Sequence, residues 1–174
     1  MTKFRILSGL PTYGPLPKQF SATGQGTHRE GFVIEFLPKS TRKWVGNFQP
    51  GLSNLYTVID HPNGQDLIVI SGGQAYVISP KQEKLKTTFG GGIEFCEYSK
   101  EIQCFIFGNG LWFEIVHKNG EPWKTKRISW DGMQNIQIKG TELSGEAYDP
   151  MTDQWYSFEV DLVHGLHKGG SYQI

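Results

Sequence analysis

The 174-residue chain is long enough to bury the core of one domain, and 13% of its residues are aromatic, each of which buries a large area. Seventeen Lys and Arg residues balance 17 Asp and Glu residues, so the chain is formally neutral. We therefore expect no nucleic-acid partner, because phosphate binding needs a positive surface. No apolar run reaches the length of a membrane span or a signal peptide, so we expect no membrane contact and a cytoplasmic location.

Residues 1–31 form the least regular part of a predicted single all-β domain over residues 1–174. Phe4–Leu7 is a possible strand. Pro11, Pro15 and Pro17 follow it, and such spacing excludes a helix and disfavours a strand. A polar, Gly-rich loop then leads to residue 31.

Strands are predicted one after another from residue 32 onward. Apolar or alternating runs occupy residues 32–36, 42–48, 56–59 and 67–70, and turn residues such as His61-Pro62-Asn63-Gly64 separate them. No window shows a sustained period of 3.6 residues, so we assign no long helix.

A short hairpin pattern occurs twice. Residues 104–115 carry two apolar runs around Gly-Asn-Gly, which suits a tight turn because glycine tolerates positive φ. Residues 67–78 match them without a gap at an offset of 37 positions. The alignment predicts that Tyr76 and Phe113 occupy equivalent buried places, and likewise Ile70 and Phe107.

A weaker repeat extends this pattern over the chain. An apolar residue, any residue and a second apolar residue recur at spacings near 40, with units centred near 34–36, 76–78, 113–115 and 158–160. Tryptophan follows two of these triplets by ten positions, as Trp44 and Trp123.

This period resembles that of β-propeller blades, without the motifs that define a propeller subfamily. The resemblance implies an antiparallel meander of four blade-like units. Several strands are apolar on both faces, which stacked blades explain; the alternative is an open β-sandwich relative whose central strands are covered by loops. The runs at 127–132, 145–150 and 169–172 are similar in style to small uncharacterised bacterial proteins, and that similarity implies no activity.

The two cysteines have two interpretations. A three-residue loop over Ser99–Glu101 would put Cys96 opposite Cys104, where a disulfide is geometrically possible. The other interpretation, which we favour, is a pair of buried thiols in a reducing compartment.

Three connections are possible between Trp123 and Ile138. A two-residue turn at Asp131-Gly132 leaves apolar residues on opposite faces of a hairpin. A three-residue connection that includes Met133 matches the faces better. The third possibility is a crossing between two repeat units rather than a hairpin.

Motifs for catalysis or metal binding are missing from the sequence. His164 and His167 are the only close-spaced histidines, and no further ligand motif accompanies them, so we assign no metal site and no cofactor. Glu35 and Glu114 take the same place in two triplets. They are either alternate-face residues at an exposed edge, or inward carboxylates that line a central channel.

Trp130 is the tryptophan that we expect to be exposed. It precedes Asp131-Gly132 at a strand end, where propeller-type proteins carry binding loops. We therefore expect a non-catalytic binding module that recognises a protein partner or a small ligand, with Trp130, Asp131, Glu35 and Glu114 as candidate site residues. The alternative is a hydrolase or lyase with carboxylates in a central channel. A homo-oligomer through an unpaired edge strand is a further possibility.

Overall fold

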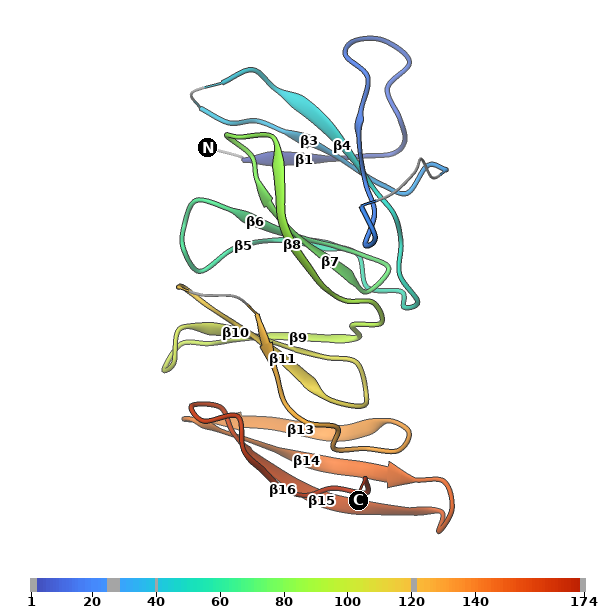
Figure 1. The fold of residues 1–174 in the computed structure, drawn as a ribbon, viewed down its shortest axis with the longest axis vertical. Coiled ribbons are helices and arrows are strands. Elements are labelled where there is room, and N and C mark those ends of the chain that lie inside the picture. Colours follow the sequence, from blue (N-terminus) through green and yellow to red (C-terminus); the bar gives the residue numbers. More distant parts are fainter. Residues whose placement is uncertain (1–2, 25–28, 40, 120–121, 173–174) are drawn as a thin grey trace. The chain divides into compact units, whose positions relative to one another are not determined.

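The computed structural model describes residues 3–24, 29–39, 41–119 and 122–172, and these residues form an all-β fold (Figure 1). Sixteen strands in the described residues make four sheets of four strands each, which we name sheets A to D. Sheet A contains β1 (Phe4–Leu7), β2 (Lys18–Phe20), β3 (Phe32–Phe36) and β4 (Trp44–Phe48). Sheet B contains β5 (Thr57–Asp60), β6 (Leu67–Ser71), β7 (Gln74–Ser79) and β8 (Lys84–Gly90).

The C-terminal half of the chain supplies the other two sheets. Sheet C contains β9 (Phe95–Ser99), β10 (Cys104–Gly108), β11 (Phe113–His117) and β12 (Trp123–Lys124). Sheet D contains β13 (Met133–Lys139), β14 (Glu142–Asp149), β15 (Gln154–Asp161) and β16 (His167–Gly169). The predicted all-β class and the four sheet units are confirmed.

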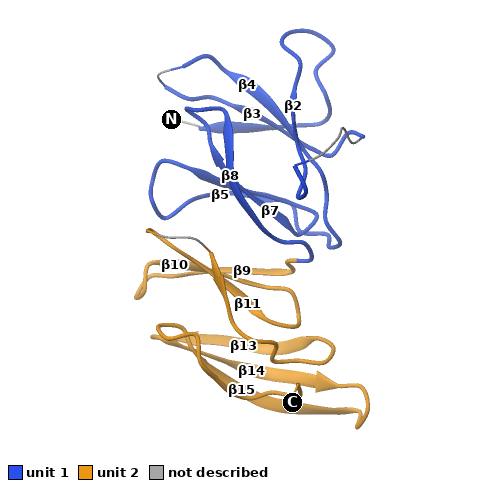
Figure 2. Cartoon of the chain, viewed as in Figure 1, with its two compact units in different colours: residues 1–92 blue, residues 93–174 orange. Residues whose placement is uncertain are grey.

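The chain divides into two compact units, residues 1–92 and residues 93–174 (Figure 2). Unit 1 holds sheets A and B, and unit 2 holds sheets C and D. Each unit has its own core cluster of buried apolar side chains, drawn from both of its sheets.

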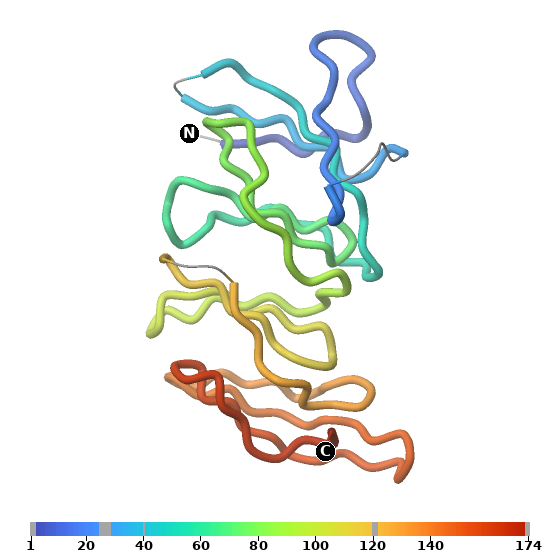
Figure 3. The backbone as a smooth tube through the Cα atoms, viewed as in Figure 1, coloured from blue at the N-terminus to red at the C-terminus, as the bar shows by residue number. Residues whose placement is uncertain are grey.

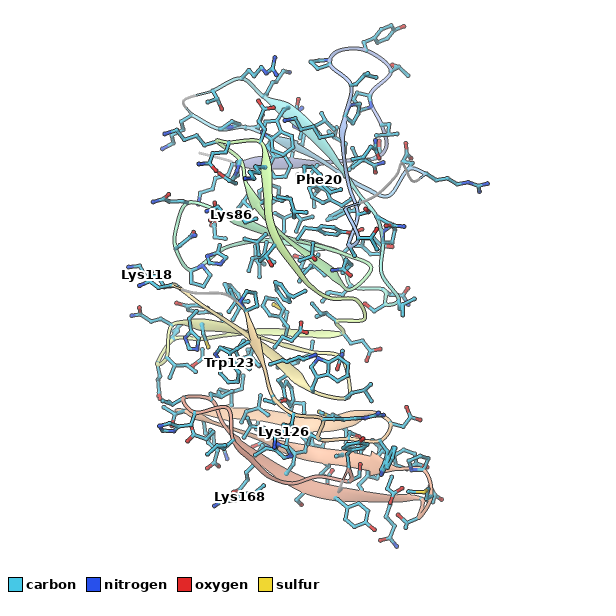
Figure 4. The ribbon with its side chains drawn as sticks, in the orientation of Figure 1. Phe20, Lys86, Lys118, Trp123, Lys126 and Lys168 are labelled. Atoms are coloured by element: carbon cyan, nitrogen blue, oxygen red, sulfur yellow. The ribbon has the colours of Figure 1, made fainter. Side chains whose placement is uncertain are left out.

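Aromatic rings dominate the core of unit 1. Phe20, labelled in Figure 4, belongs to this core. Its ring stacks on Phe48 with ring centroids 4.9 Å apart, and Phe36 stacks on Trp44 at 4.2 Å. Tyr76 from sheet B meets Phe48 from sheet A at 5.3 Å. These offset and tilted contacts are the arrangements that aromatic pairs prefer, so the rings join the two sheets of this unit.

Sheet A departs from the predicted meander. Its strand order is β1-β3-β4-β2, and β2 runs parallel to β4 at the edge. The reason is the proline-rich segment after β1, which cannot pair as a strand and instead carries the chain to the opposite edge of the sheet. Sheets B, C and D are meanders, as the winding of the tube in Figure 3 shows.

The four apolar triplets lie in similar settings, one in each sheet. Each lies in an inner strand, and both of its apolar side chains are buried and belong to the core cluster of its unit. Trp44 pairs with Phe36 and Trp123 with Ile115, so each tryptophan lies opposite the last residue of its triplet. The repeat in the sequence therefore corresponds to one triplet in each sheet. The triplet strands are β3, β7, β11 and β15.

The gapless hairpin alignment is wrong by two residues. In sheet B, Ser71 pairs with Gln74 across a two-residue turn, whereas in sheet C Gly108 pairs with Phe113 across a four-residue loop. The Asn109 side-chain oxygen accepts hydrogen bonds from the backbone N–H groups of Leu111 and Trp112. These bonds stabilise the longer loop. Ile70 and Phe107 are equivalent as predicted, but Tyr76 corresponds to Ile115 rather than to Phe113. Because two residues are one full side-chain period, every residue keeps its predicted face.

The three-residue loop that would set Cys96 opposite Cys104 does not form. Cys104 pairs with Ser99, and Cys96 pairs with Phe107, because the loop between β9 and β10 has four residues rather than three. The two thiols therefore lie on opposite faces of sheet C, and both are free.

Of the three possible connections between Trp123 and Ile138, the crossing between two repeat units is correct, and these repeat units are sheets C and D. Trp123 belongs to β12 at the edge of sheet C, and Ile138 belongs to β13 at the edge of sheet D. The segment between them passes from one sheet to the next. Ile128, in this segment, is fully buried in the core of unit 2.

Candidate functional site

Trp130 lies in the segment that joins sheets C and D, three residues before β13 begins at Met133. Its ring is half-buried and meets the Tyr172 ring edge-on, with centroids 4.5 Å apart. The Arg127 guanidinium lies 5.3 Å from the centre of the Trp130 ring and 4.7 Å from that of Tyr172, within the range of cation–π attraction. We call these three residues the ring cluster.

The Arg127 side chain is held in place by the backbone of its own loop. Its Nε donates to the Ser129 carbonyl at 2.8 Å, and its Nη2 donates to the Trp130 carbonyl at 2.8 Å. A guanidinium that uses two donors on the backbone and its face on two rings has little rotational freedom left.

Two buried serines fix the backbone beneath the rings. The Ser171 hydroxyl donates to the Tyr148 carbonyl at 2.7 Å and accepts from the Trp130 N–H at 3.0 Å. The Ser129 hydroxyl donates to the Gly132 carbonyl at 2.6 Å. The chain segments on either side of Trp130 are thus tied to sheet D, and the ring cluster has a preorganised backbone.

Asp131 follows Trp130 directly and is exposed. Its backbone N–H donates to the Tyr148 carbonyl at 3.3 Å, so this residue also joins the end of β14. An exposed carboxylate therefore lies next in sequence to an anchored, half-exposed aromatic ring. The expectation that Trp130 is the exposed tryptophan is wrong, because Tyr172 and Arg127 pack against its ring and leave it half-buried. Trp155, 42% exposed, is the exposed tryptophan instead.

Glu35 lies on the inner strand β3 rather than at an exposed edge. Its side chain, 13% exposed, forms ion pairs with Arg5 of β1, at 3.6 Å from Nη1, and with Lys43 just before β4, at 3.4 Å from Nζ. The carboxylate also lines a 160 Å³ cavity between sheet A and the proline-rich segment. The two ion pairs of Glu35 thus link β3 to β1 and to the residue before β4.

Glu114 lies on the inner strand β11 of sheet C, again away from an edge. The Trp112 Nε1 group donates to its Oε1 at 3.4 Å. Lys124, which pairs with Glu114 across the strands, reaches within 5.1 Å of the centre of the Trp112 ring. Glu35 and Glu114 therefore belong to different compact units and have different surroundings.

A cavity of 320 Å³ on sheet D gathers carboxylates that the sequence interpretation missed. Its lining includes Glu142, Glu159 and Asp161, with the exposed Leu166 beside them. Lys168, labelled in Figure 4, also lines it. These carboxylates could have been found from the alternation of polar residues along β14 and β15, because every second residue of a strand lies on the same face.

Asp161 in this cavity acts as a fixed negative charge. His164 Nδ1 lies 2.6 Å from its carboxylate, and the backbone N–H groups of Val163 and His164 donate to it at 2.8 and 3.1 Å. These hydrogen bonds, the one from His164 first, lower the pKa of Asp161. A carboxylate with a lowered pKa suits recognition of a cation better than proton donation.

The two close-spaced histidines have separate roles. His164 is exposed and engages Asp161, whereas His167 pairs with Val160 and is half-buried, and its burial lowers its pKa. No group of three or more His, Cys, Asp or Glu side chains within the described ranges has a geometry for a metal ion. Nor do those ranges contain a helix that is long and apolar enough to cross a membrane.

Comparison of the chain with models of known protein families and with curated proteins gives no match. The fold and the ring cluster are therefore the basis for any functional assignment.

Proposed function

We propose that this protein is a non-catalytic binding module that recognises a partner through the strand-end loop carrying Trp130 and Asp131. The partner is a protein segment or a small ligand, and we favour a protein segment. The observation that carries the proposal is the ring cluster, because Trp130 is half-exposed and yet anchored by Arg127, Tyr172 and Ser171.

Preorganisation supports this proposal. An aromatic side chain that is ordered before binding loses little conformational entropy when a partner arrives, and rigid aromatic residues are the usual energetic centres of interfaces. Asp131 adds a charge beside the ring, so the preferred partner carries a basic residue next to an apolar or planar group.

We also propose that the four sheets are blade-like units of the kind found in β-propellers, and that the chain resembles small uncharacterised bacterial proteins. The presence of one buried triplet in an inner strand of each four-stranded sheet supports this assignment. In propellers the loops at strand ends form the binding surface, which agrees with the choice of the Trp130 loop.

The test is a selection of phage-displayed peptides on the whole protein, followed by affinity measurements on the isolated peptides. We expect the selected peptides to share a basic residue and to bind Trp130→Ala and Asp131→Asn at least about tenfold more weakly, as for an interface hot spot. Trp112→Ala is the matched control, because Trp112 is also half-buried and in contact with a cation. Peptides that bind all four proteins equally would refute the proposal.

A further inference from the structure

The tryptophans of this chain differ in whether the chain itself places a cation over their rings. Three of the five have a Lys or Arg at 5.1 to 5.8 Å from the ring centre, namely Trp44, Trp112 and Trp130. Trp123 stacks on His117 with ring centroids 6.3 Å apart. Trp155 is the fifth, and no Lys or Arg among the described residues lies over its ring. The Trp155 ring is therefore available to a cation from outside the chain.

Trp155 is 42% exposed and lies on the face of sheet D that is turned away from the core. It pairs across β14 and β15 with Tyr148, and the two rings meet at 5.0 Å between centroids. The register puts both residues opposite Ala147 and Phe158, which belong to the core cluster of unit 2. We call Trp155 and Tyr148 the Trp155 pair.

Carboxylates surround the Trp155 pair. The Tyr148 hydroxyl donates to Asp153 Oδ1 at 2.7 Å. This hydrogen bond is the largest cause of the raised pKa of Tyr148, and the negative charges of Asp131 and Asp149 raise that pKa further. Glu146 lies two residues before Tyr148 on the same face of β14. In the described ranges no Lys or Arg forms an ion pair with any of these four carboxylates, so the site keeps its negative charge.

The site is open rather than enclosed. The linings of the 320 Å³ and 160 Å³ cavities include neither Trp155 nor Tyr148. A pocket for a free small molecule buries most of the ligand surface, which two rings on a sheet face cannot do. A side chain of a larger partner is therefore the better source of the cation, because the other contacts of that partner can cover the site.

The chemistry of the site favours arginine over lysine. A guanidinium is planar, so it can lie on the Trp155 ring while its N–H groups donate to a carboxylate at the ring edge. Arg127 combines the same two kinds of contact within this chain, since it lies 4.7 and 5.3 Å from two ring centres and donates to two backbone oxygens. The ammonium of lysine is a compact, strongly hydrated charge and gains less from a flat ring.

We infer that the Trp155 pair and its carboxylates bind an arginine side chain of a protein partner. The guanidinium lies on Trp155 and donates to Asp153. The inference rests on the proposed function, because it identifies the basic residue of the partner as arginine and adds a second contact beside the Trp130 loop. The Asp131 N–H donates to the Tyr148 carbonyl, so the ring cluster and the Trp155 pair share one backbone contact.

The test is fluorine NMR of the whole protein labelled with 5-fluorotryptophan, in which Trp155→Phe assigns the signal of interest. The probe is the acetylated and amidated peptide Gly-Arg-Gly-Arg-Gly, which has no apolar side chain for the ring cluster. We expect this peptide to shift the Trp155 signal saturably. A peptide with citrulline in place of arginine keeps the shape without the charge and should cause no saturable shift. A peptide with lysine should bind at least about twofold more weakly, as for an exposed cation–π contact.

Two variants separate the site from the general charge of the sheet. Asp153→Asn removes the carboxylate but keeps an oxygen for the Tyr148 hydroxyl, and asparagine tolerates the φ of 54° at this position. It should weaken binding of the arginine peptide at least about twofold, as for an exposed ion pair. Glu159→Gln is the matched control, because it removes one charge from the same face of β15 about 13 Å from Trp155. At about 0.15 M ionic strength the Debye length is about 8 Å, so this change should leave the affinity unaltered.

Several results overturn the inference: a Trp155 signal that stays in place, a citrulline or lysine peptide that binds as well as the arginine peptide, or an equal loss of affinity in Glu159→Gln and Asp153→Asn. Trp130→Ala should bind the arginine peptide as wild type does, because the probe has no group for the ring cluster. If the selected peptides do not depend on Trp130 while the arginine peptide shifts Trp155, only the assignment of the ring cluster fails. The opposite pair of results refutes the arginine site alone.

Discussion

Truncating Phe113 to alanine should strongly destabilise unit 2. The Phe113 ring is 1% exposed and has Phe158 at 6.0 Å and Phe95 at 6.4 Å between ring centroids. It also packs over Gly108, where even a Cβ would come within 3.0 Å of the ring. Because one wall of the resulting cavity is backbone, the site cannot collapse easily, and we expect a loss of about 3 to 5 kcal/mol.

For a chain of this length each kcal/mol lowers the melting temperature by about 2 to 4 °C, so the expected decrease is about 6 to 20 °C. Urea unfolding followed by circular dichroism measures the free energy directly, and an unchanged m-value shows that the same surface unfolds. Trp130→Ala should cost much less, because that ring is half-exposed. If Phe113→Ala hardly changes the stability while Trp130→Ala unfolds the protein, the assignment of Phe113 to the core and of Trp130 to the surface is wrong.

Three further predictions concern thiols, pH and backbone packing. Burial raises the pKa of Cys96 to about 12 and of Cys104 to about 11, so both thiols should react slowly with a disulfide reagent at pH 8 until urea is added. Burial lowers the pKa of His61 below its ordinary 6.5, so the unfolded chain binds more protons, and stability should fall as the pH drops below about 6.5. In the His61→Gln variant, the midpoint of urea unfolding should decrease less over the same pH range. Gly51→Ala should destabilise by about 1 to 3 kcal/mol, because its Cβ would lie 2.3 Å from a backbone oxygen, whereas Gly92→Ala, with open space around it, should not.

Each of these predictions has a contrary result. Rapid reaction of both thiols in the native protein would contradict their burial. A pH profile that is identical in wild type and His61→Gln would remove His61 as its cause. Equal melting temperatures for the two glycine variants would show that the loop around Gly51 can move aside.

The triplets were predictable from the sequence because their burial depends on a local period of two residues. Ile34 and Phe36 alternate with Glu35 whatever the rest of the chain does. Loop lengths were harder, because side chains decide them. Asn109 caps its own loop and shifts the hairpin register by two residues, where Gly-Asn-Gly alone favoured a tight turn.

The ring cluster was only partly predictable. Trp130 and Asp131 could be placed at a strand end from neighbouring residues, but Tyr172 lies 42 positions away, beyond the last strand of sheet D. The carboxylates of the 320 Å³ cavity come together through the pairing of β14 with β15, which sets Glu142 opposite Asp161. Contacts of this kind arise from tertiary pairing and have no local signature.

Fluorine NMR of protein labelled with 5-fluorotryptophan tests the proposed binding function most directly. The chain has five tryptophans, so each gives one signal, and Trp130→Phe assigns the one of interest. We predict that a selected peptide shifts the Trp130 signal saturably, with the binding constant found by titration, and leaves the Trp44 and Trp123 signals unchanged. A peptide that binds while the Trp130 signal stays in place would contradict the account.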